Sequence, residues 1–207
     1  GSHLPEVLCE VSLATQALSP TGRYADRFTP HCKGQVILGG GEGFLGEGFL
    51  DFPVRTDELT TGPMNQKNML KWYKKHSGLK GRYCVLDRLD GTGPGVVRGR
   101  TTYRQTDDFA NLRRAPYQYS PYLLEALLQL TGFYRLSMKI PEKRSIIPME
   151  IGEMRFSRKC RAGEQITLEA RLREQNAQSL TWDARGFDDQ GRTIMQVSNL
   201  VMQWISG

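Results

Sequence analysis

The chain has 207 residues, with 28 Lys and Arg against 22 Asp and Glu, and a formal net charge of +6 at pH 7. Its 39% hydrophobic content suits one compact domain or two small ones and excludes fibres and disordered chains. No apolar run approaches the ~18 residues that a membrane span needs, and no signal-peptide core is present. We therefore expect a cytoplasmic protein.

The cysteines indicate neither a zinc site nor a disulfide framework, because they are widely spaced and form no C-x-x-C pair. They are Cys9, Cys32, Cys84 and Cys160. A chain of this length buries about 70% of its unfolded surface, so its core needs no disulfide or metal.

The first part of the chain, residues 1–62, is predicted to be β-rich. Short apolar runs such as 36–38 alternate there with turn residues such as 19–22. The glycines at 39–43 are interpreted as a turn and not a phosphate loop, since no Lys-Ser/Thr pair follows them.

A short helix is expected at residues 65–76, with Met69, Leu70 and Tyr73 on one face. Its other face carries four lysines: Lys67, Lys71, Lys74 and Lys75. Basic residues interleaved with aromatic ones can bind nucleic acid. The same pattern fits a solvated helix face or attraction to an acidic carrier protein, and we favour these interpretations.

The second part, residues 63–207, is expected to fold as α+β, an antiparallel sheet around one long buried helix. Residues 83–103 predict a hairpin, and the alternating residues 166–172 and 180–184 predict two further strands. The helix is expected at about 121–139, with Ser120 as its N-cap, because its residues are apolar on every side.

Two polar side chains interrupt this apolar helix. Glu125 is the only charged residue between positions 120 and 134, and Gln129 lies one turn later on the same face. Burial is expected to raise the pKa of such a carboxyl, which suits a general acid, and the amide of Gln129 is able to orient a substrate oxygen. A structural Glu satisfied by Gln129 is the alternative.

The helix motif carries a family resemblance. Residues 119–129 (YSPYLLEALLQ) resemble the H-P-x-L-L-D-A-x-x-Q motif of the dehydratase domains of polyketide and polyunsaturated fatty acid synthases, which are double hotdog folds. Residues 124–134 are also similar to the single-hotdog β-hydroxyacyl dehydratases. Weaker matches flank the motif: residues 72–81 resemble the segment that opens the second hotdog, and residues 28–36 resemble a strand near the end of the first.

The resemblance implies a hotdog fold, as a partial or degenerate double hotdog. Residues 1–62 would be the end of a first hotdog and residues 63–207 a hotdog domain. It implies removal of water from a 3-hydroxyacyl chain on the phosphopantetheine of an acyl carrier protein, without metal or organic cofactor. The implied partners are that carrier, the other domains of the synthase and a second copy in a homodimer, without nucleic acid.

By position in the family motifs, Glu125 would be the catalytic acid and Gln129 the residue that orients the departing hydroxyl. Tyr119, Tyr122, Leu123 and Gly81 would contact substrate, with backbone donors at the helix N-terminus near Tyr122 and Leu123.

The family's catalytic base, a histidine in the motif H-x-x-x-G-x-x-x-x-P, is missing. Gly1-Ser2-His3 is interpreted as a cloning remnant, so His31 and His76 are the native histidines. His31 has glycine three residues later and fits a structural strand histidine. His76 ends a basic helix, where a cation complements the helix dipole. Tyr119 stands just before Ser120, where the family has another histidine.

Three interpretations therefore remain open. The chain is a dehydratase with an unrecognised or missing base, a catalytically silent pseudo-dehydratase with a structural or carrier-docking role, or a hotdog thioesterase that releases a free acid.

Overall fold

The computed structural model describes residues 7–18, 24–38, 53–77, 79–104, 121–138 and 144–206. The chain divides into two compact units, Gly1–Glu47 and Gly48–Gly207. The second unit thus begins 15 residues before the predicted boundary at residue 63.

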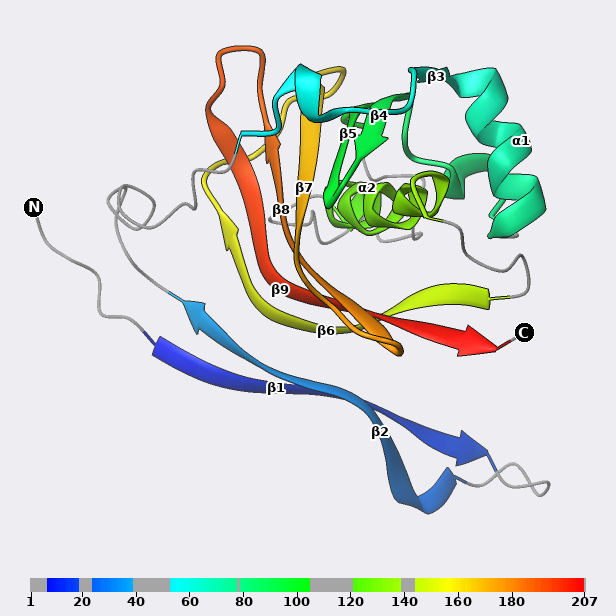
Figure 1. Cartoon of the computed structure of the whole chain (residues 1–207). Coiled ribbons are helices and arrows are strands. Elements are labelled where there is room, and N and C mark those ends of the chain that lie inside the picture. The colour runs from blue at the N-terminus through cyan, green and yellow to red at the C-terminus, as the bar shows by residue number, and fades with distance from the viewer. Residues whose placement is uncertain are drawn as a thin grey trace, which may run out of the picture. The chain divides into compact units, whose positions relative to one another are not determined.

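The first unit contains an antiparallel pair of strands, β1 (Val7–Leu18) and β2 (Tyr24–Leu38), with Val7 opposite Leu38 (Figure 1). The alternation of apolar runs and turn residues predicted these strands. The glycines at 39–43 lie outside the described residues.

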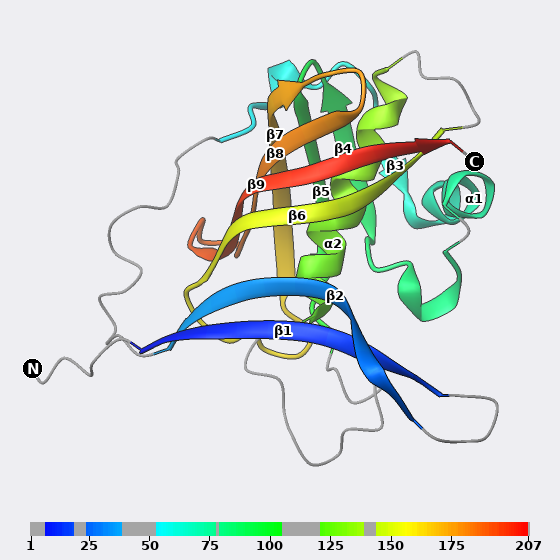
Figure 2. The same ribbon diagram turned by 90° about the horizontal axis from the view of Figure 1, so that it is seen from below.

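The second unit is built on a seven-stranded sheet with the order β3-β4-β5-β7-β8-β9-β6. Every neighbouring pair is antiparallel. The strands are β3 (Met64–Asn65), β4 (Arg88–Gly93), β5 (Val96–Thr102), β6 (Arg144–Phe156), β7 (Gln165–Gln175), β8 (Ser179–Phe187) and β9 (Thr193–Ser206). Figure 2 shows β8, β9 and β6 side by side in this order.

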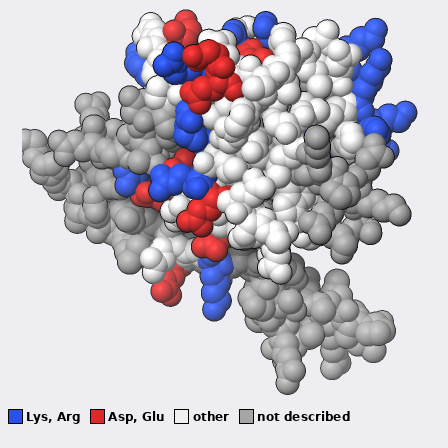
Figure 3. Space-filling view, in the orientation of Figure 1, with Lys and Arg blue, Asp and Glu red and all other residues white. Residues whose placement is uncertain are grey.

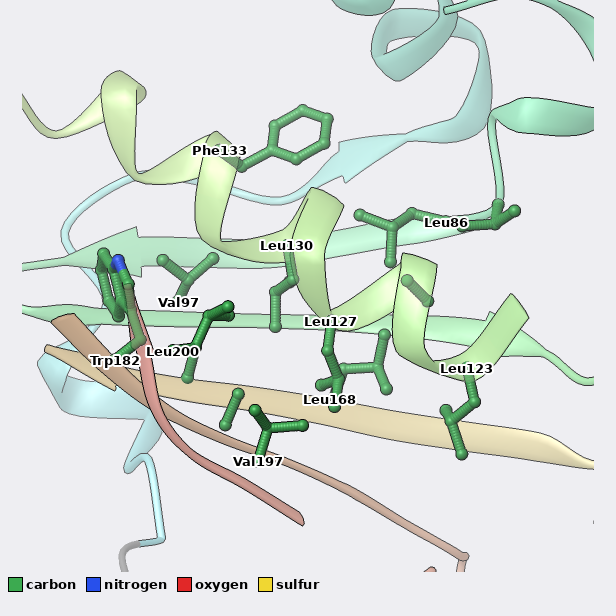
Figure 4. Close-up of a cluster of buried hydrophobic side chains, with 14 of the residues drawn as sticks. Leu86, Val97, Leu123, Leu127, Leu130, Phe133, Leu168, Trp182, Val197 and Leu200 are labelled. Atoms are coloured by element: carbon green, nitrogen blue, oxygen red, sulfur yellow. The ribbon is translucent and has the colours of Figure 1, made fainter. Parts of the chain in front are cut away.

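Helix α2 (Pro121–Gly132) lies against one face of this sheet and packs across β5, β7 and β8. Leu123, Leu127 and Leu130 are spaced so that they share one helix face, and they point toward the sheet (Figure 4). There they join Leu168, Trp182 and other fully buried side chains. This arrangement of sheet and central helix is the predicted hotdog fold.

The helical segment is shorter than the predicted 121–139. Helix α2 ends at Gly132 and continues as a 3-10 helix over Phe133–Leu136. Because the amides of Ser137 and Met138 bond to carbonyls three residues earlier, the segment tightens and ends. The predicted N-cap, Ser120, lies outside the described residues.

Helix α1 (Gln66–His76) flanks the sheet, and Asn65 caps its N-terminus: the side-chain oxygen of Asn65 accepts a hydrogen bond from the amide of Asn68. Tyr73 and Met69 are buried, as predicted, but Leu70 is 45% exposed. The buried face of α1 is therefore narrower than the apolar face that the sequence predicted.

Residues 53–62 pack against the sheet, which explains why the second unit starts early. They include a short 3-10 helix, Thr56–Glu58. The amides of Thr60 and Thr61 both donate to the carbonyl of Thr92, and the Glu58 carboxylate pairs with Arg171 at 3.0 Å. The backbone of Glu58 passes so close to Gly93 that a Cβ there would overlap the Glu58 carbonyl oxygen.

We therefore predict that Gly93→Ala lowers the free energy of unfolding by about 1–3 kcal/mol, because the added methyl has no space. The matched control is Gly62→Ala in the same segment, where nothing lies within 4 Å of an added Cβ. Thermal unfolding of both variants checks this. Equal midpoints would contradict the packing of residues 53–62 on β4.

Candidate active site

A cavity of about 260 Å³ opens beside the middle of α2. Its polar lining side chains are Tyr73, His76, Ser77, Glu125, Gln129, Arg135 and Ser145. Its other lining residues are mostly apolar: Trp72, Leu79, Leu128, Gly132, Ile146, Ile147, Pro148 and Met202. The cavity thus combines an apolar chamber with a few convergent polar groups, as ligand sites do.

Gln129 is the most connected side chain of this site. Its Nε2 donates to the carbonyl of Tyr83 at 2.6 Å and to Oε1 of Glu125 at 2.7 Å. Its Oε1 accepts from the Tyr73 hydroxyl at 2.6 Å and from the amide of Val85 at 3.3 Å. Both donors and both acceptor positions of the amide are therefore occupied by the protein.

This geometry differs from the role that the family motif implied for Gln129. An amide with four protein partners has no position left for a substrate hydroxyl. It instead fixes the carboxyl group of Glu125, which is half-buried and lines the cavity.

Tyr73 fixes the other side of the amide. Burial raises the pKa of its phenol, and the nearby Cys84 and Glu125 raise it further. The hydroxyl therefore stays protonated and remains a donor to Gln129. Burial also raises the pKa of the Cys84 thiol, which disfavours the thiolate that nucleophilic catalysis requires.

Aromatic side chains form one wall of the cavity. Trp72 stacks on Phe133 with ring centroids 4.2 Å apart, and Tyr73 meets the same ring edge-on at 5.4 Å. The ring of His76 lies 5.1 Å from that of Trp72. Such contacts hold aromatic rings in fixed positions.

The structure does not bring the predicted substrate-contacting residues together. Tyr122 and Leu123 are buried in the core and do not line the cavity. Gly81 is exposed at the start of a 3-10 helix, Gly81–Tyr83, and is likewise not part of the lining. Tyr119 lies outside the described residues.

Several lining residues were missed by sequence reasoning. Trp72 and His76 are one helical turn apart on α1, a spacing that places both on one face. Ile146 and Met202 come from β6 and β9, and no sequence signal links these strands to α2.

Two further searches cover the described part of the chain. No group of three or more His, Cys, Asp or Glu residues within it is arranged to hold a metal ion. None of its helices combines the length and apolarity that crossing a membrane requires.

Comparison with known proteins identifies the family. The model of the family described as "Polyketide synthase dehydratase N-terminal domain" matches residues 52–207. No curated protein matches the chain. The assignment of residues 1–62 to the end of a first hotdog and of residues 63–207 to a hotdog domain stays a prediction.

Solved structures agree on the fold. A dehydratase domain of a trans-AT polyketide synthase from Brevibacillus brevis is 11% identical with a TM-score of 0.66, over 95% of this chain and 66% of that one. The dehydratase domain of the CurF module of the curacin polyketide synthase is 14% identical with a TM-score of 0.69, over 96% of this chain and 65% of that one. The dehydratase domain of RzxB from Pseudomonas fluorescens is 15% identical with a TM-score of 0.63, over 96% of this chain and 67% of that one.

This chain therefore spans about two thirds of the length of such domains. The family model covers most of the second unit, including helix α2, Glu125 and the whole lining of the cavity. The chain belongs to the polyketide synthase dehydratase family.

Proposed function

We propose that this chain is the dehydratase domain of a multidomain polyketide or fatty acid synthase and removes water from a 3-hydroxyacyl thioester. The observation that carries the proposal is the placement of Glu125, a lone carboxyl group held by Gln129 at the wall of an apolar cavity. Family membership supports the same reaction.

In the proposed reaction Glu125 donates a proton to the departing β-hydroxyl. A base removes the α-proton, the carbon–oxygen bond breaks, and water and an α,β-unsaturated thioester leave. Proton transfers suffice for this chemistry, so it requires neither a metal nor an organic cofactor.

Gln129 acts as a positioning residue in this scheme. It binds Oε1 of Glu125, whereas Oε2 of Glu125 has no hydrogen-bond partner among the residues that the structure describes. The carboxyl group is thus oriented by one oxygen while the other is available to a ligand. The apolar lining, which includes Leu128, Ile146 and Met202, would hold the acyl chain.

The lysine face of α1 supports an acidic acyl carrier protein as the partner that delivers substrate. Its lysines are Lys67, Lys71, Lys74 and Lys75, all exposed. Figure 3 shows basic side chains without acidic ones at the edge where α1 lies. Since His76 of the same helix lines the cavity, a carrier on this face would reach the cavity directly. A cytoplasmic location and a homodimer belong to the same proposal.

We predict that Glu125→Gln reduces dehydration at least 100-fold, because an amide cannot donate the required proton. The assay is mass spectrometry of a 3-hydroxyacyl thioester on carrier protein, which records the loss of one water. The control is Glu150→Gln, an exposed position on β6 that does not line the cavity. A free acid as product would indicate a thioesterase, and an unchanged substrate with folded wild-type protein would indicate a silent domain.

We predict that Gln129→Leu lowers stability by about 2–4 kcal/mol, because it leaves the Val85 amide and the Tyr83 carbonyl without their buried partner. Tyr73→Phe removes one of the four hydrogen bonds and should cost about 1 kcal/mol. Urea unfolding measures both. Equal losses would contradict the central place of the amide.

We predict that Lys71→Glu raises KM for carrier-bound substrate several-fold and leaves KM for a small thioester unchanged, since only the carrier contacts this face. Steady-state kinetics with both substrates check this. Lys159→Glu, an equal charge reversal at an exposed position after β6, is the control. The same KM change in both variants would argue against docking on α1.

A further inference from the structure

A row of residues on α2 and on the 3-10 helix that follows it lines the cavity. The row consists of Glu125, Leu128, Gln129, Gly132 and Arg135. These positions are three or four residues apart and therefore share one helix face. Glu125 lies at one end of the row and the charged Arg135 at the other. The cavity thus extends along the helix, away from the carboxyl group of Glu125.

Gly132 is the member of this row without a side chain, and its backbone does not require glycine. Glycine is common at the end of a helix because it readily adopts a positive φ there. Gly132 instead has φ −63° and ψ −28°, an ordinary helical conformation. In this conformation alanine is more stable than glycine, because glycine loses more backbone entropy on folding.

Packing does not require glycine at this position either. A Cβ built on Gly132 has no atom of the described part of the chain within 4 Å, apart from its sequence neighbours and its own helix backbone. At Gly93 and Gly99, by contrast, an added Cβ would come closer than 3.0 Å to other groups. Since Gly132 also lines the cavity, the space that its missing side chain leaves belongs to the cavity.

We infer that Gly132 is a specificity-determining residue, which keeps the cavity open for the part of the acyl chain beyond its reacting carbons. This inference rests on the proposed dehydration, in which Glu125 lies at the β-carbon. Gly132 is one row position before Arg135, whose charge ends the apolar part of the row.

The distance between Glu125 and Gly132 indicates the substrate class. The seven helical steps between them span about 10 Å along the helix axis. An extended chain advances roughly 1.2 Å per bond, so about eight bonds beyond the β-carbon reach Gly132. The substrates that this row fits are 3-hydroxyacyl chains of about 10–12 carbons.

The first test is binding of two unreactive thioesters, dodecanoyl-pantetheine and butanoyl-pantetheine, to Gly132→Leu. Leucine is a good helix former, and its isobutyl group would fill this part of the cavity. We expect the affinity for the dodecanoyl thioester to fall roughly tenfold or more and that for the butanoyl thioester, which ends before Gly132, to stay within about twofold. Tryptophan fluorescence follows binding, since Trp72 lines the cavity. Gly132→Ala should give an intermediate loss and a melting temperature no lower than that of the wild type.

The control is Gly62→Leu, an equal enlargement at an exposed position that does not line the cavity. It should leave both affinities unchanged. Equal weakening of both thioesters by Gly132→Leu would mean that the pantetheine arm passes Gly132, and it would overturn the inference. An unchanged affinity for the dodecanoyl thioester, or a wild type that binds neither thioester, would also overturn it.

Turnover of the matching 3-hydroxyacyl thioesters separates this inference from the proposed function. A wild type that binds the long chain, with the expected loss in Gly132→Leu, but forms no enoyl product would overturn the proposed function and keep the role of Gly132. Dehydration of both chain lengths by Gly132→Leu at wild-type rates would overturn the inference and leave the proposed function standing.

Discussion

The amide of Gln129 is the interaction on which the rest of the site depends. It joins α1 through Tyr73, the segment before β4 through Tyr83 and Val85, and the acid Glu125 on its own helix. Tyr73 and Val85 are buried and Glu125 is partly buried, so the fold would be destabilised if their polar groups lost this partner. The cavity therefore has a rigid polar side, and Glu125 has one defined position within it.

The two faces of the sheet are stabilised in different ways. The face toward α2 carries close-packed apolar side chains (Figure 4). Elsewhere the strands carry carboxylates that are almost fully buried: Glu169 pairs with Arg98 and Arg185, and Asp183 pairs with Arg173. Asp188, in the turn between β8 and β9, is also almost fully buried and paired with arginines. Burial alone would raise its pKa, but hydrogen bonds from Arg192 and Arg158 outweigh this effect and hold the pKa at about 2.

Sequence patterns predicted the elements better than their ends and contacts. The apolar helix, its motif and the alternating strands were correct because they depend on local periodicity. The end of α2 was wrong because a change from α to 3-10 hydrogen bonding leaves no mark in composition. Tyr122 and Leu123 were placed at the substrate because a helix that is apolar all round does not show which side faces a cavity. The partners of Gln129 could not be predicted from the sequence for another reason. Two of them are backbone groups, whose chemistry is the same at every residue.

The close contact between residues 53–62 and β4 also bears on how this chain has to be divided in engineering. A chain that starts at residue 63, where composition changes, would lose the partner of Arg171 and the donors to the Thr92 carbonyl. Without Glu58 over Gly93, the edge of the β4–β5 hairpin would be exposed to solvent. Domain exchange between synthases therefore needs a junction upstream of Pro53, so that the transplanted sheet keeps the short segment that covers it.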